Sequence, residues 1–143
     1  MQNFLTGAGS FTADGDLIGA YGDARVSYID AADIAACAQA LLTGPVRAGE
    51  TFILTGPEAL SHAEIATRLS AAWRRPIRYV DLARDRFAAR LAAQGLPADF
   101  AADVAFLFAE VATGTLAATT THVQDLTGRA PRTFAEFLAR GAS

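Results

Sequence analysis

Lysine is absent from this sequence, and all twelve basic residues are arginine. The chain therefore cannot use a lysine base, a Schiff base or a phosphate-binding lysine. Cys37 is the single cysteine, so no intrachain disulfide can form. The cysteine and the two histidines also lack the spacing of a metal site. These scarcities predict a protein of the reducing cytoplasm that binds no metal.

Long apolar runs and an excess of positive charge are also missing. No stretch approaches the roughly 18 apolar residues of a membrane-spanning helix, and residues 1–7 lack the basic start of a secretion signal. The formal net charge is −3, so the chain offers no basic surface to a polyanion. We therefore expect neither a membrane nor a nucleic acid among its partners.

The sequence does contain enough apolar material for a packed core. Its 143 residues are 52% hydrophobic and 19% charged, and domains of about 100–150 residues are the commonest size. The sequence shows no internal repeat and no long linker. Residues 1–143 are therefore expected to form a single domain.

After a short helical end and a glycine-broken loop at residues 1–17, three segments have the composition of β-strands. Residues 25–29 and 77–80 alternate polar and apolar side chains, and residues 51–55 form a short β-branched apolar run. These segments predict a small parallel or mixed sheet.

Helix patterns separate and follow these strands. Residues 31–42 are strong helix formers behind the capping residue Asp30, and their predicted buried face holds Ile34, Cys37, Ala38 and Leu41. Another helix begins at a capping box formed by Ser61 and Glu64. The alternation predicts an α/β fold.

The remainder of the chain is predicted to be helical. Helices are expected at residues 83–94, 98–112 and 131–140, with a short piece at 120–126. Apolar residues in the second of these have helical spacing, which predicts an inward-facing stripe of Phe100, Val104, Leu107 and Val111.

Two segments carry a more specific pattern. Residues 28–35 are Tyr-Ile-Asp-Ala-Ala-Asp-Ile-Ala, and residues 51–61 are Thr-Phe-Ile-Leu-Thr-Gly-Pro-Glu-Ala-Leu-Ser. They resemble the NmrA-like, atypical short-chain dehydrogenase/reductase family, which includes NAD(P)H-dependent quinone reductases and azoreductase-like members. With supporting matches at 1–4, 75–80 and 126–134, the resemblance covers almost the whole chain, in the order of the family's second half.

This resemblance implies a partial Rossmann-like fold without the glycine-rich turn that seats the dinucleotide pyrophosphate in the family's first half. The sequence Gly7-Ala8-Gly9 has neither the preceding strand nor the third glycine of such a turn. The Tyr and Lys pair of classical short-chain dehydrogenases cannot occur either, because the sequence has no lysine, and Arg25 stands four residues after Tyr21. We therefore expect no cofactor in this chain alone, and NADPH or NADH once an amino-terminal half completes it.

The resemblance also suggests substrate-binding residues, namely Asn3, Phe4, Tyr28 and Phe106. Asn3 and Phe4 match the place where the chain leaves the family's sheet near the nicotinamide, and phenylalanines of the late helices could wall the cleft. Simpler roles compete with each prediction, since Asn3 could cap a turn and the phenylalanines could fill the core.

Other polar residues favour structural roles. Asp30 and Asp33 could act as paired carboxylates, but capping and helix-dipole compensation explain them more simply. His62 is expected to be exposed in the first turn of its helix, and Cys37 to be a small buried hydrophobe. The arginines 74, 75 and 78 fit a solvated edge better than an anion site. We name no catalytic residue.

The function that fits best is the substrate-binding portion of an NAD(P)H-dependent oxidoreductase acting on a quinone-like or small carbonyl compound. A homodimer or a complementing chain would bury the surface that the first half covers. Two alternatives remain, a non-catalytic ligand-binding or regulatory module and a cofactor-free enzyme of the cyclase or isomerase type. A large apolar pocket would favour the cofactor-free enzyme, and a flat apolar face would favour a partner.

Overall fold

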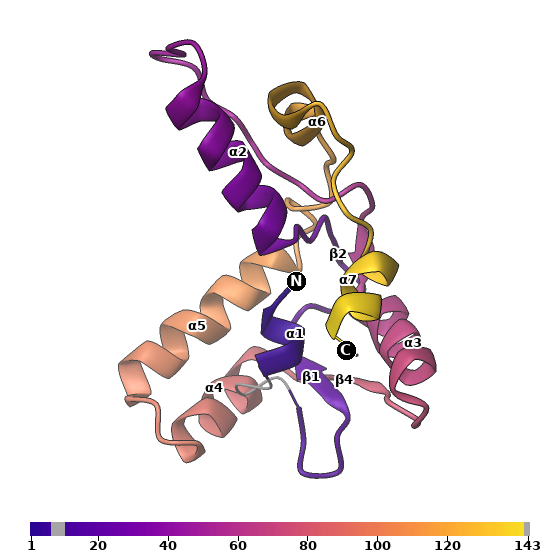
Figure 1. The fold of residues 1–143 in the computed structure, drawn as a ribbon. Helices are drawn as coiled ribbons and strands as arrows, with labels where there is room; N and C mark the ends of the chain where they lie inside the picture. The colour runs from indigo at the N-terminus through magenta and orange to yellow at the C-terminus, as the bar shows by residue number, and fades with distance from the viewer. Residues whose placement is uncertain (7–10, 142–143) are drawn as a thin grey trace.

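The computed structural model of the chain describes residues 1–6 and 11–141. Helices dominate these residues, and strands are short (Figure 1). The strands are β1 (Leu17–Gly19), β2 (Arg25–Val26), β3 (Leu60–Ser61) and β4 (Tyr79–Asp81). The helices are α1 (Asn3–Thr6), α2 (Ala31–Thr43), α3 (His62–Trp73), α4 (Arg84–Ala93), α5 (Ala98–Val111), α6 (His122–Thr127) and α7 (Phe134–Gly141).

The strands form two small sheets rather than one. β1 pairs with β4 in parallel, with Leu17 opposite Tyr79. β2 pairs with β3 in antiparallel orientation, with Val26 opposite Leu60. The chain is therefore a mixed α/β fold with many helices around few strands, as the sequence predicts. The prediction for Gly7-Ala8-Gly9 falls outside the described residues.

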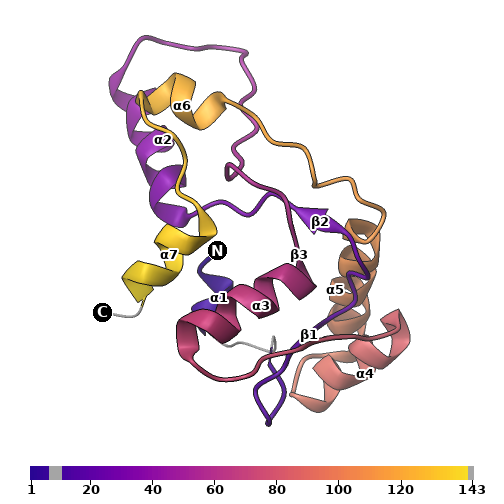
Figure 2. The same cartoon turned by 90° about the vertical axis from the view of Figure 1, so that its right-hand side faces the viewer.

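Two groups of helices lie at opposite ends of the molecule (Figures 1 and 2). α2 packs against α6 at one end, and α4 packs against α5 at the other. α3 and α7 contact each other between these ends. None of the helices within the described residues is long and apolar enough to cross a membrane.

The start of α2 follows the sequence prediction. Asp30 is its amino-terminal cap, and the Asp30 carboxylate accepts a hydrogen bond of 2.8 Å from the amide of Ala32. The predicted buried face is wrong in part. Cys37 is buried, but Ile34 is 44% exposed, because α6 covers only one side of α2.

Both parts of the predicted capping box of α3 are present. The Glu64 amide donates to the Ser61 hydroxyl, and the Ser61 amide donates to the Glu64 carboxylate at 2.8 Å. The helix buries Ile65 and Leu69 in a core that also contains residues of β1, α1 and α7.

The predicted strand at residues 51–55 is wrong, since this segment is extended but pairs with no strand among the described residues. Side chains bind its backbone instead. The Ile53 amide donates to Nδ1 of His122 at 2.9 Å, and the Thr120 hydroxyl donates to the Ile53 carbonyl at 2.6 Å. A strand needs a backbone partner, and no described segment supplies one.

The predicted inward stripe of α5 is wrong in part. The helix buries Ala101 and Ala105, while Phe100 is 56% exposed and Leu107 is 59% exposed. The small alanines belong to the core that α4 and α5 share, and Val104 of the predicted stripe packs against that core. Phe100 and Leu107 are left on the flank of the helix.

Candidate ligand pocket

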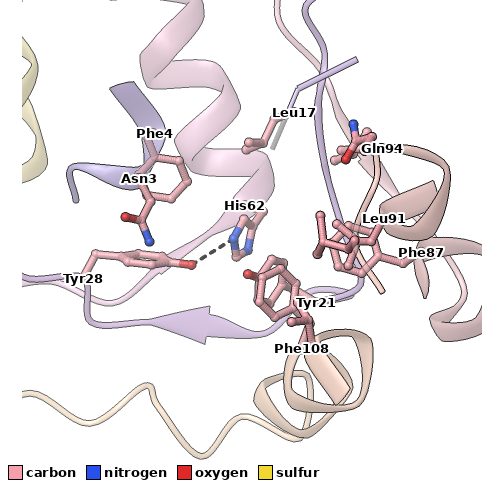
Figure 3. A pocket seen from close by; sticks show the side chains of 13 residues that line it. Asn3, Phe4, Leu17, Tyr21, Tyr28, His62, Phe87, Leu91, Gln94 and Phe108 are labelled. Carbon is pink, nitrogen blue, oxygen red and sulfur yellow. Dashed lines mark hydrogen bonds between the residues drawn. The ribbon is translucent and has the colours of Figure 1, made fainter. Parts of the chain in front are cut away.

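A cavity of about 590 Å³ opens beside the core, between the amino-terminal segment and the α4–α5 pair. Pockets for small molecules commonly have volumes of about 300–1,000 Å³ and mostly apolar walls. The close-up in Figure 3 shows how the lining side chains converge. The lining consists of Asn3, Phe4, Leu17, Ile18, Tyr21, Tyr28, His62, Phe87, Leu91, Gln94, Leu96, Val104 and Phe108.

The secondary structure explains why these residues meet. β1 contributes the buried Leu17 and Ile18, and its parallel pairing with β4 fixes this wall. α4 contributes Phe87 and Leu91 from its buried face. The packing of α5 on α4 then brings the side chains of α5 to the same cavity.

His62 lies at the polar end of the cavity and is only 2% exposed. The prediction of an exposed histidine is therefore wrong. His62 directly follows β3, and the pairing of β3 with β2 holds the first turn of α3 against the core. Aromatic rings of Tyr21, Tyr28 and Tyr79 surround the imidazole.

The imidazole makes one hydrogen bond within the described residues. Its Nε2 lies 2.9 Å from the Tyr28 hydroxyl, the interaction drawn in Figure 3. Its Nδ1 is buried and finds no partner in the described part of the chain. Burial lowers the pKa of His62 to about 4, although the charge of Asp81 opposes this shift. His62 is therefore neutral at neutral pH.

Tyr21 connects His62 to the apolar end of the cavity. The Tyr21 and His62 rings are stacked, with centroids 3.8 Å apart and an interplanar angle of 6°. Phe108 stacks on Tyr21 at 4.5 Å, and Phe87 stacks on Phe108 at 5.1 Å. Four rings from β1–β2, α3, α4 and α5 thus form a continuous stack along the cavity wall.

Backbone and side-chain contacts hold Tyr21 in this position. The Tyr21 amide donates to the Tyr79 hydroxyl at 3.0 Å, and that hydroxyl donates to the carboxylate of Asp81 at 2.7 Å. The Gly22 amide donates to the same carboxylate at 2.8 Å. The end of β4 therefore fixes the turn that carries Tyr21.

The tyrosine hydroxyls at this end of the cavity remain protonated. Burial raises the pKa of Tyr21, and the nearby side chains of Tyr28 and Tyr79 raise it further. Burial also raises the pKa of Tyr28, while the neighbouring Tyr21 side chain acts in the opposite direction.

Three of the four predicted substrate-binding residues line this cavity. Asn3 and Phe4 come from α1, and Tyr28 follows β2. Phe4 is also core, since its ring packs edge-on against Tyr28 and against Phe134. Phe106 lies elsewhere: it is 54% exposed and borders a separate hollow between α4 and α5.

Sequence reasoning did not select His62, Tyr21 or Phe108 as site residues. For His62 the sequence did offer a signal of burial, because the residue stands next to the cap residue Ser61 and two positions after the apolar Leu60. The stacking of Tyr21 on Phe108 had no such signal, because the two residues are 87 positions apart in sequence and meet only through the packing of α5.

The other polar residues considered in the sequence have structural partners. Asp33 is buried and forms an ion pair with Arg132, whose amide also donates to Asp33 at 2.8 Å. Arg78 pairs with Asp16 at 3.0 Å. Arg75 lies over the ring of Trp73. Within residues 1–6 and 11–141, no group of Cys, His, Asp and Glu could hold a metal ion.

The described residues do not fit the phosphates of a dinucleotide. Such a site needs a strand that runs through a glycine-rich turn into the amino terminus of a helix. β4 does run into α4, but Leu82 and Ala83 join them and no glycine is present. After β1, the turn containing Gly22 leads to β2 and not to a helix.

Comparison with known proteins gives a consistent picture, although no protein-family model matches the chain. The chain is 40% identical to an NAD(P)H azoreductase of Xenophilus azovorans over 137 residues, which are 96% of this chain and 48% of that enzyme. Its fold superposes on a crystal structure of the Escherichia coli NADPH-dependent quinone oxidoreductase QOR2 with a TM-score of 0.85 and 27% identity.

The match to that quinone oxidoreductase covers 97% of this chain and 50% of the other. A structure of QOR2 complexed with NADPH matches with a TM-score of 0.82 and the same 27% identity, over 97% and 49% of the two chains. The chain thus spans about half the length of the relatives it matches. Nearly the whole chain is therefore similar to about half of an NAD(P)H azoreductase and about half of an NADPH-dependent quinone oxidoreductase.

Proposed function

We propose that this chain is the substrate-binding portion of an NAD(P)H-dependent oxidoreductase that acts on a quinone-like or other small carbonyl compound. In this proposal it corresponds to the carboxy-terminal half of an NmrA-like, atypical short-chain dehydrogenase/reductase. Its relatives are an NAD(P)H azoreductase and a quinone oxidoreductase, and it matches about half of each.

The observation that carries the proposal is the aromatic cavity. A flat ring can pack against the stacked rings of Tyr21, Phe108 and Phe87, because aromatic pairs favour offset or parallel contacts at such distances. Asn3 and Tyr28 supply polar atoms at the same cavity. An apolar cavity with a few polar groups can select a small aromatic substrate and fix its orientation.

The roles of the chain under this proposal are to bind the substrate, orient it and exclude water. The described residues lack the glycine-rich turn that seats a dinucleotide pyrophosphate, so this proposal assigns NADPH or NADH to an amino-terminal half. That half belongs either to the same polypeptide or to a complementing chain. A homodimer is the other arrangement that would cover the exposed apolar faces.

A second candidate is a cofactor-free enzyme, such as a cyclase or an isomerase. The presence of the cavity within this chain favours it, since binding the substrate needs no further segment. The hydrogen-bonded Tyr28 and His62 would then be the groups that move protons. A regulatory module that binds a ligand without turnover has no observation of its own in its favour.

Calorimetric titration of the purified chain tests the proposal. The ligands are NADPH, NADH and 2,3-dimethyl-1,4-naphthoquinone, whose ring carbons are blocked against addition of the Cys37 thiol. We expect binding of one naphthoquinone per cavity and no binding of either nucleotide at millimolar concentration. Stoichiometric nucleotide binding would contradict the division of roles between the halves. Failure to bind the naphthoquinone would contradict the substrate class.

A further inference from the structure

The polar end of the cavity contains more hydrogen-bond donors than it uses. The Tyr21 hydroxyl, the Tyr28 hydroxyl and the neutral His62 ring carry three hydrogens in total. Within the described residues one hydrogen bond joins these groups, between Tyr28 and His62 at 2.9 Å. This bond uses one hydrogen, so two donors remain for another molecule.

The position of the hydrogen on the His62 ring decides which of these donors remain. If Nδ1 carried it, a buried N–H would stay without an acceptor in the described part of the chain. Orphaned buried N–H groups are rarer than under-satisfied acceptors, and each costs free energy. The hydrogen is therefore placed on Nε2, where it donates to the Tyr28 oxygen. The remaining donors are then the hydroxyls of Tyr21 and Tyr28.

These hydroxyls lie beside surfaces that suit a flat ring. Both tyrosines and His62 line the cavity, and the stack formed by Tyr21, Phe108 and Phe87 continues from them along its wall. In Figure 3 the Tyr28 ring extends toward His62, on which the Tyr21 ring is stacked. A ligand that fills the apolar end can place an oxygen within reach of the polar end.

We propose that the hydroxyls of Tyr21 and Tyr28 form a donor site for the carbonyl oxygen of a planar aromatic ligand, with His62 as the positioning residue that directs them. This inference rests on the proposed function, because it uses the same cavity and substrate class. It adds the residues that select a carbonyl compound over a hydrocarbon of the same shape. His62 acts only through Tyr28 and Tyr21.

The charge state of the cluster fits this role. The raised pKa values of both tyrosines keep the hydroxyl donors protonated, and the lowered pKa of His62 keeps the ring neutral. The charge that opposes the lowered pKa of His62 is Asp81, which already accepts hydrogen bonds from the Tyr79 hydroxyl and the Gly22 amide. A neutral acceptor can therefore enter without displacing a counter-ion.

A pair of ligands with the same shape tests the donor site. Calorimetry or equilibrium dialysis gives the affinity of the full chain for 2,3-dimethyl-1,4-naphthoquinone and for 2,3-dimethylnaphthalene. We expect Tyr28→Phe to weaken quinone binding about three- to tenfold, which is the usual worth of one neutral hydrogen bond. Binding of the hydrocarbon should not change, because the ring remains in place.

Two further comparisons separate a positioning role from general damage. His62→Gln places an amide N–H near the position of Nε2 and should keep the preference for the quinone. His62→Asn reaches only the position of Nδ1 and should lose most of that preference. Thr67→Ala removes an exposed hydroxyl of α3 that does not line the cavity, and it should leave the ratio of the two affinities unchanged.

The results distinguish failure of this inference from failure of the proposed function. If the wild-type chain binds the quinone and Tyr28→Phe binds it equally well, the donor site is wrong and the substrate class stands. Equal weakening of both ligands by Tyr28→Phe would also overturn the donor site, since the variant would then alter only the shape of the cavity. A wild-type chain that does not bind the quinone overturns both.

Discussion

At the scale of single residues, the burial of His62 connects the site to the stability of the protein. The pKa of His62 falls from 6.5 in the unfolded chain to about 4 in the folded one, chiefly through burial. Between these two values the unfolded state binds a proton that the folded state does not. The free energy of unfolding therefore decreases as the pH falls from about 6.5 to 4.

We expect this decrease to reach roughly 3 kcal/mol at pH 4, since each pKa unit corresponds to about 1.4 kcal/mol. Urea unfolding followed by circular dichroism between pH 7 and pH 4.5 measures it. His62→Gln should flatten the dependence over this range. An unchanged slope in His62→Gln would show that His62 titrates normally in the folded chain.

A second prediction concerns the ion pair that joins α2 to the segment before α7. Asp33 is buried and accepts from both the side chain and the amide of Arg132. Asp33→Ala leaves the guanidinium without its partner, so we expect a loss of about 3 kcal/mol in the free energy of unfolding. Denaturant unfolding measures this loss.

The exposed pair of Arg47 and Glu50 supplies the control. Glu50→Ala should change the free energy of unfolding by less than about 1 kcal/mol, because exposed pairs contribute little. An equally small effect of Asp33→Ala would mean that the Arg132 guanidinium finds other partners or reaches solvent.

The sequence predicted local roles better than distant partners. Asp30, Ser61 and Glu64 act as caps within a few residues of themselves, so sequence spacing was sufficient. The partner of Asp33, Arg132, is 99 positions away in the sequence, and local residue spacing cannot predict such a contact. The burial of His62 was missed for the same reason, since its neighbours come from β1, β2 and β4.

At the scale of secondary-structure elements, the capping box of α3 positions the first turn that carries His62 into the cavity. Ser61→Ala removes the hydroxyl that accepts from the Glu64 amide. We expect a loss of about 1 kcal/mol, the usual cost of deleting an amino-terminal cap. Thermal or urea unfolding provides the measurement.

Thr67→Ala is the matched control within the same helix. Thr67 is exposed, and its hydroxyl bonds only to the Ala63 carbonyl one turn earlier among the described residues. Its replacement should be neutral or slightly stabilising, because alanine has the higher helix propensity. Equal effects of the two substitutions would argue that the capping box does not stabilise α3.

The elements predicted least well are those that need a partner surface. α2 and α3 carry their own start signals in Asp30 and the Ser61–Glu64 capping box, and the structure confirms both. Residues 51–55 have strand composition, but a strand also needs a neighbouring backbone, and none of the described segments provides it. The stripe at Phe100 and Leu107 has the right periodicity, but nothing in the described chain covers it.

At the scale of the whole molecule, apolar side chains of several helices remain exposed to solvent, and those of α2 form a stripe. Ile34 is 44% exposed and Leu42 is 86% exposed, and both lie on the side of α2 away from α6. Ala38 lies between them at helical spacing and is also exposed. An apolar stripe of this kind is typical of a surface that binds another protein chain or domain. The chain matches only about half of its relatives' length, which is consistent with a further domain on this surface.

We predict that the isolated chain forms a homodimer through this face of α2, because no charged residue interrupts the stripe of Ile34, Ala38 and Leu42. Sedimentation equilibrium measures the dissociation constant. The double substitution Ile34→Glu and Leu42→Glu should weaken the dimer by about tenfold or more, since each copy would then bury unpaired charge.

Phe106→Glu is the control that locates the interface. Phe106 is 54% exposed and lies at the other end of the molecule, on α5, so its substitution should leave the dimer intact. If Phe106→Glu dissociates the dimer and the α2 variant does not, the interface involves α4 and α5. A wild-type chain that sediments as a monomer would contradict self-association, and the α2 face would then be assigned to a complementing nucleotide-binding half.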